Sequence, residues 1–193
     1  MWSFLAPAAP EIGLTQTILN RPGVLVAVII GTIVLGALAW LLANSLGWNR
    51  WAAVLAAAGL ALALSVTLVR PGGHLPHRAD NPLYLCIHDS FSLHGGLQLL
   101  NFAMLMPLAL FGALATRRPI STAVGCALLS AGIEVTQALT GLGICQKQDF
   151  LNNTIGAIVA VVIAWALLIV SGTNGPGRGH RDRHHTGAGT LAA

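Results

Sequence analysis

Glu134 is a carboxylic acid inside a long apolar segment that contains no other charged residue. Ser130 precedes it by four residues and Gln137 follows it by three, so the three side chains share one face of a helix. Within a membrane, ionisable residues are costly and mark functional sites by default. A carboxyl group in that place can act as a general acid or base, bind a ligand or gate a transport path.

Further polar residues stand at the start of two other apolar segments. Asp149 is expected to be the N-cap of one helix, which Asn152 and Asn153 then continue. Gln98 and Asn101 stand near the start of another. We call these residues the polar cluster; its members are Gln98, Asn101, Glu134, Gln137, Asp149, Asn152 and Asn153.

The composition excludes a soluble enzyme. Of the 193 residues, 55% are hydrophobic and only 8% are charged, and the mean hydropathy is +0.74. A soluble domain carries about 25% charged residues, which it needs to cover its surface. The net charge of +4 comes from Lys and Arg residues in loops and tails, where basic residues set membrane topology, so no nucleic-acid partner is expected.

Five apolar blocks are each long enough to cross a bilayer, for which a helix needs about 20 residues. Continuous rather than alternating apolar character excludes a β-barrel. The predicted fold is an all-α polytopic transmembrane bundle of about five helices, with the lipid bilayer as its first partner. The blocks run from Val24 to Ala43, Ala52 to Val69, Leu97 to Ala115, Ile120 to Leu139 and Thr154 to Val170.

The basic residues favour an orientation with the amino terminus outside and the carboxyl terminus in the cytoplasm. The clearest indicator is the hairpin at Arg117 and Arg118, where both charges lie directly at helix ends. Alternate passes of the chain then bring the polar cluster to one leaflet, the outer one in this orientation. The clustering itself does not depend on which side is outside.

The regions outside the blocks predict little chemistry. Residues 1–23 form a lead interrupted by prolines, residues 24–171 form the bundle, and residues 172–193 form a basic disordered tail. Within the loop at residues 70–96, Asn81 and Pro82 begin a short amphipathic interfacial helix. The histidines there lack the close spacing of metal ligands, so neither a metal nor another cofactor is expected; they are His74, His77, His88 and His94.

Two cysteines lie in loops that a five-helix topology places on the same side of the membrane. On an oxidising outer face, Cys86 and Cys145 are expected to form a disulfide between the loop at residues 70–96 and the loop at residues 140–153. Two free thiols are the alternative, and a reversed orientation would favour the disulfide no more than the free thiols. Cys126 lies inside a helix.

Three motifs resemble the VanZ-like family of bacterial membrane proteins, which are associated with resistance to the glycopeptide antibiotic teicoplanin. Asn101-Phe102 with Pro107 resembles the family's Asn-to-Pro helix, Ser130 to Gln137 its Ser-x-x-Ile-Glu-x-x-Gln helix, and Asp149 to Gly156 its Asp-x-x-x-Asn-Thr-x-Gly helix. The resemblance covers roughly residues 52–170. The chain departs from the family at Ala109, where Gly is common, and upstream of Asp149, where a further acid is common.

The resemblance implies a multi-pass protein of the bacterial plasma membrane whose characteristic residues include Glu134, Gln137, Asp149 and Asn153. We rank a module that binds a glycopeptide or a lipid-linked cell-wall precursor first. An intramembrane enzyme with Glu134 as general acid or base comes second, and a proton-linked transporter or flippase third. Hydrogen bonding between helices, without any further function, would also explain the polar residues. The sequence does not decide the oligomeric state.

Overall fold

The computed structural model describes residues 23–69, 93, 95–142 and 145–172, and these residues form helices without strands. The predicted all-α fold is confirmed, with five helical spans long and apolar enough to cross a membrane, α5 and α6 together making one span. The predicted interfacial helix, most of the amino-terminal lead and nearly all of the tail lie outside the described residues. The helices are α2 (Val24–Leu46), α3 (Arg50–Leu68), α5 (Gly96–Met104), α6 (Met106–Thr116), α7 (Pro119–Thr140) and α8 (Lys147–Val170).

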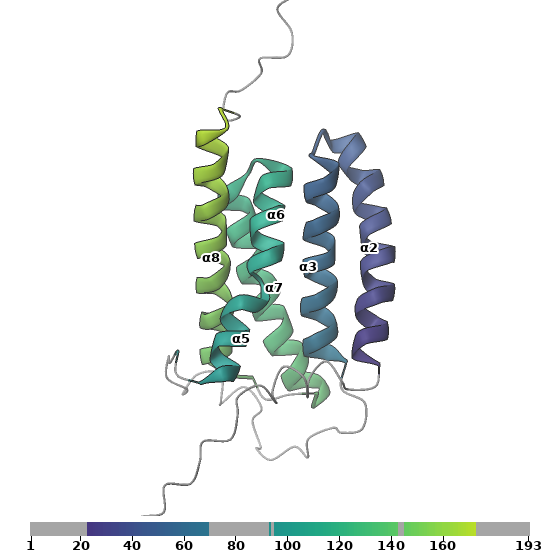
Figure 1. Cartoon of the computed structure of the whole chain (residues 1–193). Helices are drawn as coiled ribbons and strands as arrows, with labels where there is room; N and C mark the ends of the chain where they lie inside the picture. Colours follow the sequence, from purple (N-terminus) through teal and green to yellow (C-terminus); the bar gives the residue numbers. More distant parts are fainter. Residues whose placement is uncertain (1–22, 70–92, 94, 143–144, 173–193) are drawn as a thin grey trace, which may run out of the picture.

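The helices stand side by side and run alternately up and down (Figure 1). Helix α2 packs on α3, and the other face of α3 packs on α6. Helix α8 packs on α6, α7 and α5. Helices α2 and α8 therefore lie at opposite edges of the bundle (Figure 1). The ends of α3 and α7 and the starts of α2, α5 and α8 all lie at one end, which we call the polar end.

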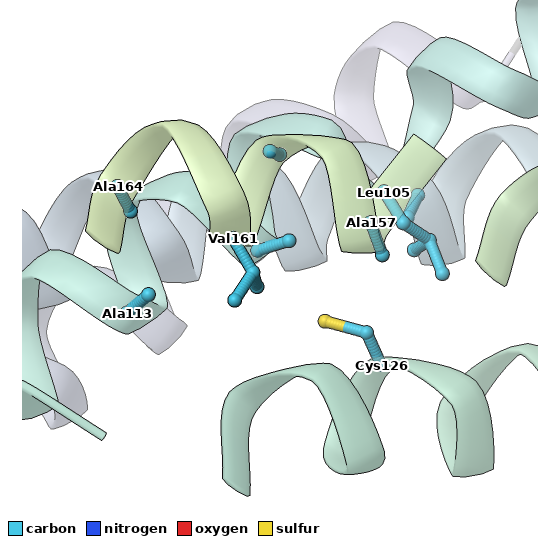
Figure 2. Close-up of a cluster of buried hydrophobic side chains, with 9 residues drawn as sticks. Leu105, Ala113, Cys126, Ala157, Val161 and Ala164 are labelled. Carbon is cyan, nitrogen blue, oxygen red and sulfur yellow. The ribbon is translucent and has the colours of Figure 1, made fainter. Parts of the chain in front are cut away.

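Small residues fill the centre of the bundle and large apolar residues face outward. The main core consists chiefly of buried alanines of α6 and α8, with Leu105, Cys126 and Val161 among them. Figure 2 shows Cys126 of α7 opposite Ala157 and Val161 of α8. Leu, Ile and Val side chains of α2, α7 and α8 are exposed, as expected of faces that contact lipid.

The third span, expected from Leu97 to Ala115, runs from Gly96 to Thr116 and is interrupted at Leu105. Helix α5 ends at Met104 and α6 begins at Met106, with Leu105 between them. Pro107 explains the break because it has no N–H group to donate to the carbonyl one turn earlier and its ring crowds that carbonyl.

Two glycines of neighbouring helices lie against the backbone beside this break. A Cβ atom on Gly156 of α8 would meet the carbonyl oxygen of Phe102 at 1.8 Å. A Cβ atom on Gly59 of α3 would meet the backbone nitrogen of Leu108 at 2.7 Å. The broken span is thus held between α3 and α8 by contacts that only glycine permits.

Candidate functional site

The polar cluster is distributed at the polar end over α5, α7 and α8, of which α5 and α7 both pack on α8. Gln98 and Asn101 lie in α5, Glu134 and Gln137 in the last two turns of α7, and the remaining three residues in the first two turns of α8. The members on α5 are half-buried. The other end of each helix carries no member of the cluster.

Glu134 is 4% exposed and binds the start of α8. Its Oε2 atom accepts a hydrogen bond of 2.9 Å from the backbone N–H of Gln146, the N-cap residue of that helix. The first N–H groups of a helix have no partner within it, and its dipole attracts negative charge. Both effects stabilise a carboxyl group in this otherwise unfavourable place.

Gln137, one turn closer to the end of α7, binds the end of another helix. Its side-chain Nε2 donates a hydrogen bond of 3.0 Å to the carbonyl oxygen of Thr67, in the last turn of α3. Carbonyls in the last turn lack a donor from the helix itself. Gln137 therefore gives a hydrogen-bond donor to a free carbonyl at the end of α3, just as Glu134 gives an acceptor to a free N–H at the start of α8. Thr67 carried no signal in the sequence analysis, because a free carbonyl at a helix end belongs to every residue type.

Asp149 is not the N-cap of α8, which corrects the sequence-based expectation. The helix begins at Lys147, after Gln146 as N-cap, so Asp149 lies in the first turn. The predicted span from Thr154 therefore starts about two turns too late. Polar residues lower the apparent hydropathy of these turns, but their side chains face neighbouring helices: Asn152 and Asn153 are fully buried.

The two acidic side chains of the cluster lie near each other. The carboxylate of Asp149 interacts electrostatically with that of Glu134. The two acidic groups thus stand on α7 and α8, two helices that pack against each other, at the same end of the bundle.

A second layer of polar atoms lies deeper in the bundle. Ser130 is one turn further from the polar end than Glu134, and Asn153 is one turn further than Asp149, on the same helix faces. The Ser130 Oγ, Asn153 Oδ1 and Thr154 Oγ1 atoms are buried and have no hydrogen-bond partner among the described residues. Such atoms normally have a partner, so this layer can bind a polar group or water. Ser130 and Thr154 were outside the predicted cluster, although the helical spacing from Glu134 did single out Ser130.

The cysteines differ in state. Cys145 is buried and disulfide-bonded, whereas Cys126 is a free buried thiol. Cys86 lies outside the described residues, so its pairing with Cys145 stays a prediction. Within the described part of the chain no three His, Cys, Asp or Glu residues come together as metal ligands.

Five apolar helical spans, with buried carboxyl and amide groups gathered at one end, define a polytopic helical membrane protein. Residues 74–169 match the family model described as VanZ/LLP1, and the chain belongs to the VanZ-like family. The match includes every member of the polar cluster and leaves α2 and α3 outside, whereas the resemblance was expected to begin near residue 52. No curated protein and no solved structure matches the chain.

Proposed function

We propose that the protein binds a glycopeptide or a lipid-linked cell-wall precursor at the polar end, from the outer leaflet of the bacterial plasma membrane, and thereby lowers sensitivity to teicoplanin. The observation that carries the proposal is the deeper layer of unpartnered oxygens beneath the acidic pair. Ser130 is 0% exposed and Asn153 is 1% exposed, yet the Oγ of one and the Oδ1 of the other lack a partner among the described residues.

Those oxygens suit a ligand that carries hydroxyl or amide groups. A buried polar atom without a partner costs about 1 to 3 kcal/mol, a cost that a hydrogen-bonding ligand removes. Glu134 above this layer adds a second carboxyl oxygen, besides the one bonded to Gln146, that can accept from N–H or O–H donors. Sugars and peptides, which form both classes of proposed ligand, supply such donors.

Residues of the polar cluster and of the deeper layer have different roles in this proposal. Gln137 already binds the Thr67 carbonyl, so its role is to close the bundle around the site. Glu134 keeps one bond to the start of α8 and presents the rest of its carboxyl group. Ser130 and Asn153 contact the ligand.

Two features at the ends of the bundle support this orientation. The disulfide-bonded Cys145 stands at the polar end, and disulfides persist on the oxidising side of a membrane. Arg117 and Arg118 stand at the opposite end, where positive charge favours the cytoplasm. Both features support a polar end that faces outward.

An intramembrane enzyme is the second candidate, favoured by the proximity of Asp149 and Glu134. Two neighbouring carboxyl groups can divide the work of general acid and general base. The sequence alone offered no second catalytic group beside Glu134. A lipid-linked envelope molecule would be the substrate.

The test measures teicoplanin and vancomycin susceptibility in a sensitive host that lacks the protein, at matched membrane abundance. Glu134→Gln keeps an acceptor for the Gln146 N–H but loses the charge, so we expect it to remove protection against teicoplanin. Ser130→Ala combined with Asn153→Ala should do the same. Thr140→Val is the control, because Thr140 is exposed and bonds only within α7.

Three outcomes distinguish the possibilities. If the wild type protects against teicoplanin and both site variants protect equally well, the polar residues serve only in helix packing. An absence of any teicoplanin effect in the wild type would refute the resistance function. Turnover of a lipid-linked precursor by the purified protein, lost in Glu134→Gln and in Asp149→Asn, would establish the enzyme in place of the binding module.

A further inference from the structure

The end of the bundle opposite the polar end carries three arginines, Arg50 at the start of α3 and Arg117 and Arg118 in the turn between α6 and α7. The backbone N–H of Asn49, between α2 and α3, donates a hydrogen bond of 3.2 Å to the carbonyl of Ala115, just before the α6–α7 turn. Arg50 therefore lies beside the turn that holds Arg117 and Arg118. We call these three residues the arginine surface; all three are exposed.

Aromatic and apolar side chains border the arginine surface. Trp51, which directly follows Arg50, is 72% exposed. Ile120, which lies two residues after Arg118, is 79% exposed. The Trp51 ring packs edge-on against Trp40, with centroids 5.1 Å apart. Exposed tryptophans beside basic residues are typical of the boundary between acyl chains and headgroups. The arginines are thus placed at headgroup depth.

The arginines differ in how they are held. The Arg50 guanidinium lies 5.4 Å from the centre of the Trp40 ring and donates a hydrogen bond to Asn44 Oδ1, so it is fixed in place. The side chains of Arg117 and Arg118 make no hydrogen bond or ion pair with any described residue. Two guanidinium groups are consequently available beside a fixed third, and guanidinium groups bind phosphate oxygens in a bidentate manner.

The start of α7 adds backbone donors at the same place. Arg118 is the N-cap of α7 and has no side-chain cap, and Pro119 follows as the first helical residue. The Arg118 N–H donates to Thr116 Oγ1 and Pro119 has no N–H, so the backbone donors at this helix start are the N–H groups of Ile120 and Ser121, where the helix dipole also favours negative charge. The donors and the arginines together favour an anion over any neutral group.

We propose that the arginine surface binds the phosphodiester headgroup of an anionic phospholipid, with its acyl chains against Trp51 and Ile120. The apolar border favours a lipid over a soluble phosphate, which would gain nothing from it. This inference concerns the end away from the polar cluster and does not depend on the proposed function.

The test uses native mass spectrometry of the purified full-length chain in neutral detergent, with phosphatidylglycerol or phosphatidylcholine added at equal concentration. Detergent removes any effect of membrane orientation. We expect the wild type to retain phosphatidylglycerol preferentially. Arg117→Gln and Arg118→Gln should each lower its occupancy about fivefold, the ratio that corresponds to about 1 kcal/mol per basic residue at an anionic surface.

The control is Lys147→Gln, which removes one positive charge from an exposed residue at the polar end. We expect it to leave lipid occupancy unchanged. Equal retention of the two lipids by the wild type, or equal loss in Lys147→Gln and Arg118→Gln, would overturn the proposal. Complete displacement of phosphatidylglycerol by millimolar inorganic phosphate would instead assign the surface to a soluble anion. Far-UV circular dichroism confirms that each variant keeps its helices.

Discussion

Replacing Gly156 by Ala should strongly destabilise the bundle. The added Cβ atom would lie 1.8 Å from the carbonyl oxygen of Phe102 and 2.8 Å from the carbonyl carbon. Real Cβ atoms do not approach other atoms closer than 3.0 Å, so α5 and α8 must separate by about 1.2 Å at this point. Both partners are backbone, and no flexible side chain can yield.

The expected loss lies at the upper end of the range for overpacked cores, about 3 kcal/mol. For a chain of this length that corresponds to a melting temperature lower by roughly 6 to 12 °C. Alanine is the better helix former by about 0.5 to 1 kcal/mol, and this gain offsets only part of the loss.

The assay is thermal unfolding of the full-length protein in detergent, followed by far-UV circular dichroism. Gly132→Ala is the matched control, because Gly132 lies on the exposed face of α7 and a Cβ atom there meets nothing within 4 Å. It should be neutral or stabilising. A Gly156→Ala variant that melts within 2 °C, or about 1 kcal/mol, of Gly132→Ala would refute the close approach of α5 and α8.

Two further predictions concern the polar end. Gln137→Leu removes the hydrogen bond to the Thr67 carbonyl and should lower the unfolding free energy by about 0.6 to 1.7 kcal/mol, whereas Thr140→Val, which loses only a bond within α7, should have a smaller effect in the same melting assay. Equal effects of the two substitutions would show that the hydrogen bond between α7 and α3 contributes nothing to the free energy of unfolding. Peptide mass mapping without reductant should recover Cys86 linked to Cys145, while alkylation of both thiols in unreduced protein would contradict the disulfide.

The number of spans could be predicted from the sequence because it depends on local properties, the length and hydropathy of each segment. The gathering of polar residues at one end could be predicted for the same reason, since antiparallel helices of similar length bring alternate ends together. The break near Leu105 had a local cause in Pro107, but a proline kinks some helices and interrupts others, according to what packs beside it.

The contacts within the site could not be predicted, because they join residues that no spacing relates. Thr67 is 70 residues from Gln137, and the hydrogen bond between them depends on how α3 packs beside α7. The start of α8 was misplaced for a related reason. Asn152 and Asn153 are typical of a loop by hydropathy, and only their burial against other helices explains why they are helical.

The hydrogen bond from Gln137 to Thr67 crosses the border of the family match. Gln137 lies within residues 74–169, but α3, which supplies the acceptor, lies before them. A fragment trimmed to the matched residues would lose this acceptor and also the helix whose Gly59 packs beside the broken span. The matched range therefore does not coincide with the packed bundle, because α3 packs on α6 from outside the match and α2 packs in turn on α3.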